Sequence, residues 1–108
     1  MLDIQINGIE LLDNEADKER AQELLNEYGP KIERMLSNDV VMRVHFKEHE
    51  KEGNRVKHSI SVRIEYGNNL FQADDFDWDL ARAIHKVMKK LENEIEHKLH
   101  VSDQYDKR

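Results

Sequence analysis

The side chains best suited to intermolecular chemistry lie in residues 75–99, where lysine, arginine and histidine recur at helical spacing. A rotation of about 100° per residue places these residues on one crest, opposite an apolar stripe. The crest consists of Arg82, Lys86, Lys89, Asn93, His97 and His100. Among the acids of this stretch, only Glu96 comes close to the crest. Such a positive ridge suits contacts with phosphate groups, although a long helix also commonly carries charge for solvation alone.

An acidic cluster precedes the ridge, and a calcium loop and helix capping are both conceivable there. Its members are Asp74, Asp75, Asp77 and Asp79. A calcium loop needs a glycine after its third acid and a glutamate near its end, but Leu80 and Lys86 occupy these positions. We therefore expect the carboxylates to cap the free amide groups at the start of a helix.

Neither a metal site nor a catalytic centre is indicated by the remaining polar residues. His45 and His49 would be about 13 Å apart along a strand, too far to share one ion. His97 and His100, three apart on a helix, could meet one ion, but exposed terminal histidines ordinarily face solvent. The chain has no cysteine, phosphate-binding glycine loop or nucleophile elbow. We expect no enzyme, no metal and no cofactor.

The length of 108 residues fits one domain, which we place at residues 1–100, followed by a flexible tail at 101–108. Charged residues are 37% of the chain and apolar residues 38%, which is typical of a solvated globular protein. The sequence has neither an apolar run of membrane-spanning length nor the pattern of a signal peptide. We expect a cytoplasmic protein that is monomeric.

The charge of the chain is unevenly distributed. The net charge of −6 argues at first against a polyanionic partner. Residues 10–39 contain nine acids and four bases, whereas residues 40–63 contain three acids and six bases. Positive charge is therefore concentrated locally, where it can attract an anion in spite of the net charge.

Hydrophobic periodicity predicts the element order β-α-β-β-β-α. The strands are expected at residues 2–6, 40–47, 56–66 and 70–73, and the helices at 14–36, capped by Asp13, and 75–99. Gly29-Pro30 predicts a kink or two helices meeting there, because proline removes a backbone donor. Residues 47–54 are rich in charge and predict an exposed, mobile hairpin tip.

This order predicts an α+β two-layer sandwich with both helices on one face of a four-stranded mixed sheet. The first two strands should be parallel because a helix connects them, and the later strands should be antiparallel hairpins. The other face of the sheet would be open.

The run from Asp79 to Ile95, DLARAIHKVMKKLENEI, resembles the second helix of the ribosome hibernation promoting factors, also called ribosome-associated inhibitors or sigma modulation proteins. That family typically has an aspartate, an alanine-isoleucine pair and a lysine-leucine-glutamate run. Here these are Asp79, Ala83-Ile84 and 90–92. The opening IQI of residues 4–6, the element order and the length extend the resemblance to the family's short form over nearly the whole chain. The acidic residues 13–27 and Gly29-Pro30 depart from the family pattern, so the chain resembles a divergent member.

The resemblance implies a non-catalytic factor that binds rRNA of the small ribosomal subunit in the decoding channel and inhibits translation during dormancy or stress. Basic residues of both helices would contact the RNA. The expected contacts are Arg82, His85, Lys86, Lys89, Lys90, His97, Lys31 and Arg34.

Two other functions remain open from the sequence. A double-stranded RNA-binding module has a similar element order, but its last helix usually begins with bases and not with the acids of residues 74–79. A protein-interaction domain would use the edge strand at residues 70–73 or the open sheet face.

Overall fold

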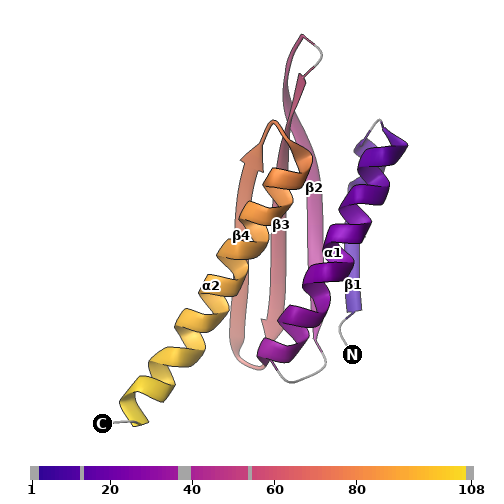
Figure 1. Ribbon diagram of the computed structural model, residues 1–108. Coiled ribbons are helices and arrows are strands. Elements are labelled where there is room, and N and C mark those ends of the chain that lie inside the picture. The colour runs from indigo at the N-terminus through magenta and orange to yellow at the C-terminus, as the bar shows by residue number, and fades with distance from the viewer. Residues whose placement is uncertain (1–2, 13, 37–39, 54, 107–108) are drawn as a thin grey trace.

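The computed structural model describes residues 3–12, 14–36, 40–53 and 55–106 (Figure 1). Its elements are β1 (Asp3–Asn7), the short 3-10 helix η1 (Ile9–Leu11), α1 (Glu15–Leu36), β2 (Val41–Glu52), β3 (Arg55–Tyr66), β4 (Asn69–Asp77) and α2 (Leu80–Asp106). The predicted cap Asp13 lies outside the described residues. Asn14 caps α1, because its side-chain Oδ1 accepts a hydrogen bond of 2.8 Å from the amide of Ala16.

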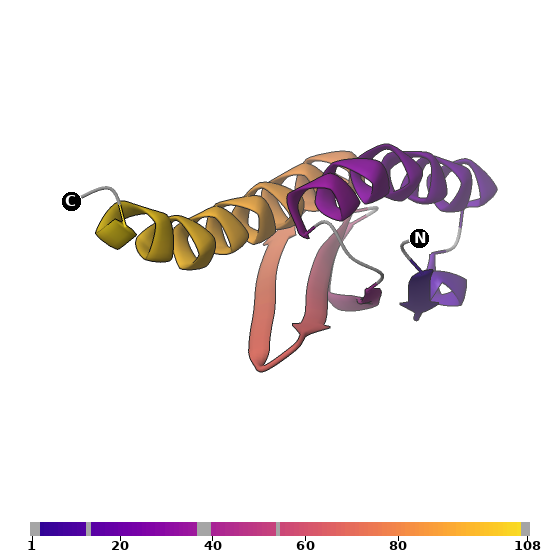
Figure 2. The same ribbon diagram turned by 90° about the horizontal axis from the view of Figure 1, so that it is seen from below.

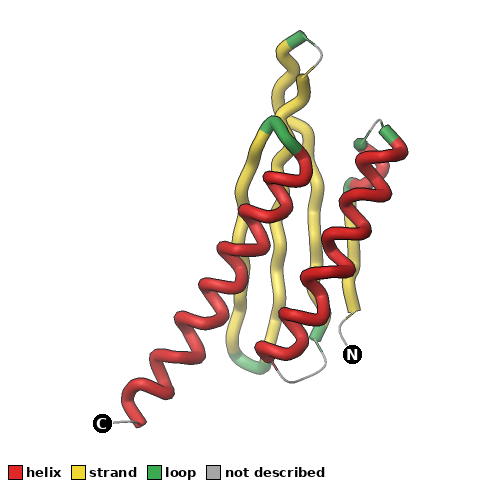
Figure 3. The backbone as a smooth tube through the Cα atoms, viewed as in Figure 1, coloured by secondary structure: helices red, strands yellow, loops and turns green. Residues whose placement is uncertain are grey.

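The four strands form one sheet in the order β1-β2-β3-β4. β1 pairs with β2 in parallel, and the other two pairings are antiparallel. Both helices cover the same face of this sheet (Figures 2 and 3). The predicted α+β sandwich and its element order are therefore confirmed.

The core lies between the helices and the inner face of the sheet. α2 buries the apolar stripe predicted from its periodicity, and the strands bury alternate residues against it. The buried residues of α2 are Leu80, Ala83, Ile84, Val87, Met88, Leu91 and Ile95. Those of the strands are Met42, Val44, Phe46, Ile60, Val62, Ile64 and Phe71. Full burial of one large apolar side chain stabilises the fold by about 1.5–3 kcal/mol, so this layer fixes the position of α2.

Of the two outcomes predicted at Gly29-Pro30, two helices meeting there is wrong, and a kink stays a prediction. α1 is a single helix that contains Pro30. A proline inside a helix costs about 3 kcal/mol. Burial outweighs this cost, because Tyr28 and Ile32 lie in the core on either side of the proline, whose ring is exposed.

The boundary between β4 and α2 also differs from the prediction. β4 continues to Asp77, and α2 begins at Leu80 and not at residue 75. Asp75 lies opposite Ile60 in the ladder, so it belongs to the strand. The predicted capping role holds for Asp79, whose Oδ1 accepts a hydrogen bond of 3.0 Å from the amide of Arg82.

The hairpin between β2 and β3 is more regular than expected. Strand structure continues to Glu52 and resumes at Arg55, with a register shift between Glu48 and Lys51. Most of residues 47–54 therefore belongs to the paired strands, because backbone pairing continues past the charged side chains. At the other end of the chain, α2 includes residues 101–106 of the predicted tail, so this segment is helical. Its flexibility stays a prediction.

Candidate nucleic-acid interface

Besides Lys90, which reaches β4, α2 holds four of the predicted RNA contacts in exposed positions: Arg82, His85, Lys89 and His97. They project from the side of the helix opposite the core stripe, as the helical spacing predicts. Among the described residues, neither Arg82 nor Lys89 forms an ion pair. The charge of Lys89 is therefore available to an external anion, and that of Arg82 is available as well, although it also acts on the nearby carboxylate of Asp77.

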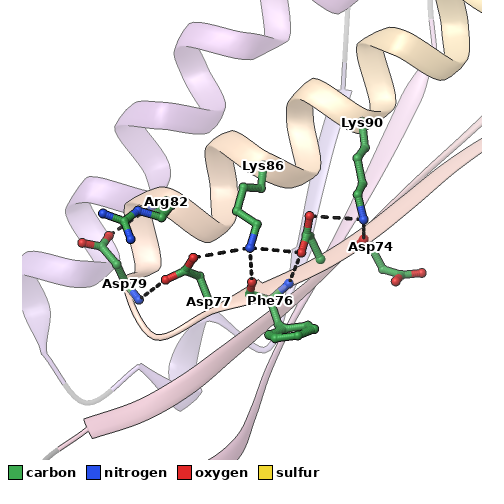
Figure 4. Close-up of polar contacts among 8 residues, drawn as sticks. Asp74, Phe76, Asp77, Asp79, Arg82, Lys86 and Lys90 are labelled. Atoms are coloured by element: carbon green, nitrogen blue, oxygen red, sulfur yellow. Dashed lines mark hydrogen bonds and ion pairs between the residues drawn. The ribbon is translucent and has the colours of Figure 1, made fainter.

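Three other lysines of α2 reach across to β4, which is an edge strand of the sheet. Each ammonium group donates a hydrogen bond to a backbone carbonyl of that strand. Figure 4 shows the contacts of Lys86 and Lys90. The pairs are Lys86 with Phe76 at 2.8 Å, Lys90 with Asp74 at 3.2 Å and Lys98 with Leu70 at 2.6 Å. An edge strand otherwise presents unpaired carbonyls to other chains. Lys86 and Lys90, both predicted RNA contacts, therefore also protect this edge.

The carboxylate of Asp75 lies between the same two lysines. Its Oδ1 is 3.4 Å from Nζ of Lys86, and its Oδ2 is 3.2 Å from Nζ of Lys90. Asp77 Oδ2 lies 3.4 Å from Lys86 Nζ as well. Burial opposes ionisation of Asp75, but the amide of Phe76 and the two lysines outweigh it, so the pKa of Asp75 is below its ordinary value. The amide of Asp79 and Lys86 likewise lower the pKa of Asp77.

The lowered pKa of Asp75 predicts a loss of stability in acid. The Asp75 carboxylate takes up a proton near pH 3.8 in the unfolded chain and at a lower pH in the folded chain. The contribution of its ionised form to the stability of the fold is therefore complete above pH 3.8 and is lost as the pH falls through the folded pKa. D75N should remove part of this acid dependence. It should also lower the free energy of unfolding at pH 6 by about 1 kcal/mol, because the ion pairs are partly exposed. Urea unfolding at pH 6, 4 and 3 measures both effects.

The matched control is D74N, because Lys90 contacts the backbone carbonyl of Asp74 and not its carboxylate. This variant should keep the acid dependence of the native chain. An unchanged acid dependence in D75N would contradict the assignment of that dependence to Asp75.

The seam between α1 and α2 brings together predicted contacts from both helices. The hydroxyl of Tyr28 and Nδ1 of His85 share a hydrogen bond of 2.7 Å. Lys31 Nζ lies 5.2 Å from the centre of the Tyr28 ring, a cation–π distance. Burial, followed by the charges of Glu92 and Glu27, raises the pKa of Tyr28, so its hydroxyl remains protonated. Lys31 and His85 therefore both contact Tyr28, and Arg34 is exposed one turn beyond Lys31.

The chain matches a known protein family over nearly its whole length. The family model described as "Hibernation factor Hib, C-terminal domain" matches residues 3–108. The chain belongs to this family. The hibernation-factor resemblance predicted from the second helix is thus confirmed. A search of curated protein sequences gave no match.

Solved structures similar to this Hib-family chain have the same fold. A ribosomal subunit interface protein from Coxiella burnetii has a TM-score of 0.64 and 17% identity, over 93% of this chain and 99% of that chain. The N-terminal domain of Protein Y from Thermus thermophilus has a TM-score of 0.54 and 17% identity, over 90% and 98% of the two chains. At this level of identity the likeness establishes the fold alone.

The structure of this Hib-family chain also reveals polar and aromatic residues that the sequence interpretation did not single out. Phe76 is 51% exposed, and Lys57 Nζ lies 4.0 Å from its ring centre. Nineteen positions separate the two residues, so only the β3–β4 register, which pairs Ser59 with Phe76, brings them together. If the predicted strand at residues 70–73 had extended to residue 76, alternation along the strands would have placed the side chains of Lys57 and Phe76 on the outer face of the sheet.

Within the described ranges, no group of three or more histidine or acidic side chains is placed to hold a metal ion. None of the described helices is long and apolar enough to cross a membrane.

Proposed function

We propose that this chain is a non-catalytic factor that binds rRNA of the small ribosomal subunit in the decoding channel and inhibits translation during dormancy or stress. It would act in the cytoplasm as a monomer and without a cofactor. Membership of the hibernation factor family supports this proposal. So does the name of one structural neighbour, a ribosomal subunit interface protein.

The observation that carries the proposal is a set of exposed basic residues on both helices, on either side of an α1–α2 seam that also holds the carboxylates of Glu27 and Glu92 near Tyr28. Arg82 and Lys89 are exposed on α2, and Lys31 and Arg34 are exposed on α1. The hydrogen bond between Tyr28 and His85 joins the two groups. We expect phosphates to lie along this surface, with Arg82 and Lys89 making the strongest contacts.

Lys86 and Lys90 have a smaller role in this proposal than the sequence predicted. Both are bound to Asp75 and to β4 carbonyls. An RNA phosphate would have to compete with these intramolecular partners, so each lysine would add less affinity than an unpaired cation. The same lysines disfavour a protein-interaction domain that adds a strand to β4, because they already occupy its edge carbonyls.

Co-sedimentation with purified small ribosomal subunits tests the proposal. Binding through about four phosphate contacts predicts that raising the salt from 50 to 200 mM weakens affinity about 50-fold, because each contact releases counterions. Prior occupation of the channel by messenger RNA and transfer RNA should compete with this binding. Salt-resistant binding, or binding that is indifferent to these competitors, would contradict occupancy of the channel through phosphate contacts.

A further inference from the structure

The second face of the sheet carries an ordered set of polar side chains and no helix. α1 and α2 both pack on the opposite face, as the view in Figure 2 shows. Strand alternation directs Arg43 and Lys47 of β2 outward, together with Lys57 and Arg63 of β3. We call these four residues the sheet cations.

The sheet cations lie close together on the two central strands. Arg43 is directly opposite Arg63 in the ladder, and Lys47 is opposite Ser59. Like charges placed opposite each other destabilise a sheet. The Arg63 guanidinium lies 3.7 Å from Glu65, but both side chains are more than half exposed, so this ion pair compensates little. The arginine pair thus lowers the stability of the fold, and an anionic ligand would relieve the repulsion.

Among the side chains that the structure describes, the acids of the open face lie at its margins. Asp3 is on the edge strand β1, Asp74 is on the edge strand β4, and Glu65 is near the end of β3. Asp75 and Asp77 are directed to the other side of β4, where Lys86 holds them. The centre of the open face is therefore positive even though the chain has a net charge of −6.

Aromatic rings lie beside the sheet cations. Phe76 projects from β4 and is 51% exposed, with Lys57 Nζ 4.0 Å from its ring centre. Arg55 lies 4.9 Å from the ring centre of Trp78, the next aromatic residue along the chain. Exposed aromatic rings next to cations are the features that bind single-stranded nucleic acid: bases stack on the rings and phosphates contact the cations.

We propose that the open face of the sheet binds single-stranded RNA. Phosphates lie along Arg43, Arg63 and Lys47, and one base stacks on Phe76. The bases of a duplex are already stacked and cannot reach this ring, so single strands are the preferred ligand. This surface lies on the opposite side of the domain from the proposed rRNA interface of the helices, and it goes beyond that function because a separate strand occupies it.

Binding of fluorescein-labelled 12-nucleotide oligouridylate and of a 12-base-pair RNA duplex, followed by fluorescence anisotropy at several salt concentrations, tests this inference. R43T/R63T replaces two exposed arginines by a residue that suits a strand. It should weaken oligouridylate binding at least about 10-fold and reduce the salt slope by about 1.4, the value for two lost phosphate contacts. F76T should weaken binding about 5- to 100-fold with little change in the salt slope. Thermal unfolding verifies that each variant folds.

Two controls separate this surface from the helices. K18Q/R20Q removes one half-buried and one exposed charge from the acidic half of α1, so it matches the charge change of R43T/R63T and should bind oligouridylate normally. R82E/K89E alters the proposed rRNA interface and should affect subunit binding much more than oligouridylate binding. Oligouridylate binding that is absent, equal for single strand and duplex, or unchanged in both R43T/R63T and F76T overturns the inference. In that case subunit co-sedimentation still reports on the helix interface independently.

Discussion

The double variant R82E/K89E is expected to bind small ribosomal subunits at least about 100-fold more weakly than the native chain. Both side chains are exposed on α2, and neither forms an ion pair among the described residues. One charge-assisted hydrogen bond contributes about 1.5–3 kcal/mol, so losing two such contacts accounts for this factor before repulsion is added. The new glutamates would also repel the phosphates.

The measurement is co-sedimentation at 100 mM salt with native chain, R82E/K89E and a variant of equal net charge. That control is K18E/R20E, which makes the same change of four charge units on the acidic half of α1. Among the described residues, Lys18 and Arg20 form surface ion pairs with Glu15 and Glu23, so their loss should alter stability by less than about 1 kcal/mol. Equal weakening by both variants would show that net charge governs binding and that the α1–α2 surface does not.

Lys86 and Lys90 are left unchanged in this variant for a structural reason. A glutamate at position 86 would stand beside the carboxylates of Asp75 and Asp77, and one at 90 beside Asp75. Such changes would expose the carbonyls of β4 and add repulsion between acids. A loss of binding would then be indistinguishable from a local loss of structure.

The fold could be predicted from the sequence because periodic burial dominates it. Ile84, Val87 and Leu91 recur at helical spacing, and all three are buried against the sheet. The alternation of Val44 with charged residues likewise identified β2. The prediction failed at Pro30, where burial of the flanking residues outweighs the local cost of proline, an effect visible only once the sheet is in place.

The candidate site could be predicted only in part. Helical spacing placed Arg82 and Lys89 correctly on the exposed side of α2. It could not show that Lys86 and Lys90 reach β4, because the periodicity predicts that residues 75–77 belong to the helix and not to a strand beneath it. The approach of Lys57 to Phe76 is also a property of strand register. Pairing between distant residues is the information that local periodicity lacks.

Replacing Gly8 by alanine is expected to be the most destabilising single change considered for this chain. Gly8 follows β1 with φ of +85°, in the left-handed region that disfavours a side chain. A Cβ at this position would lie 2.3 Å from the backbone oxygen of Phe46. β2 cannot easily move away, because Phe46 is paired with Ile60 in the ladder and its side chain is buried.

G8A should lower the free energy of unfolding by about 3–4 kcal/mol, the sum of about 1–2 kcal/mol of left-handed strain and the displacement of backbone in a packed sheet. A typical domain has only about 5–15 kcal/mol in total, so much of its stability would be lost. G67A is the matched control, since Gly67 has φ of +60° but nothing within 4 Å of an added Cβ. It should show the strain alone, about 1–2 kcal/mol. Urea unfolding followed by circular dichroism compares the two variants, and equal losses would show that the close approach of Gly8 to β2 is not a constraint on the fold.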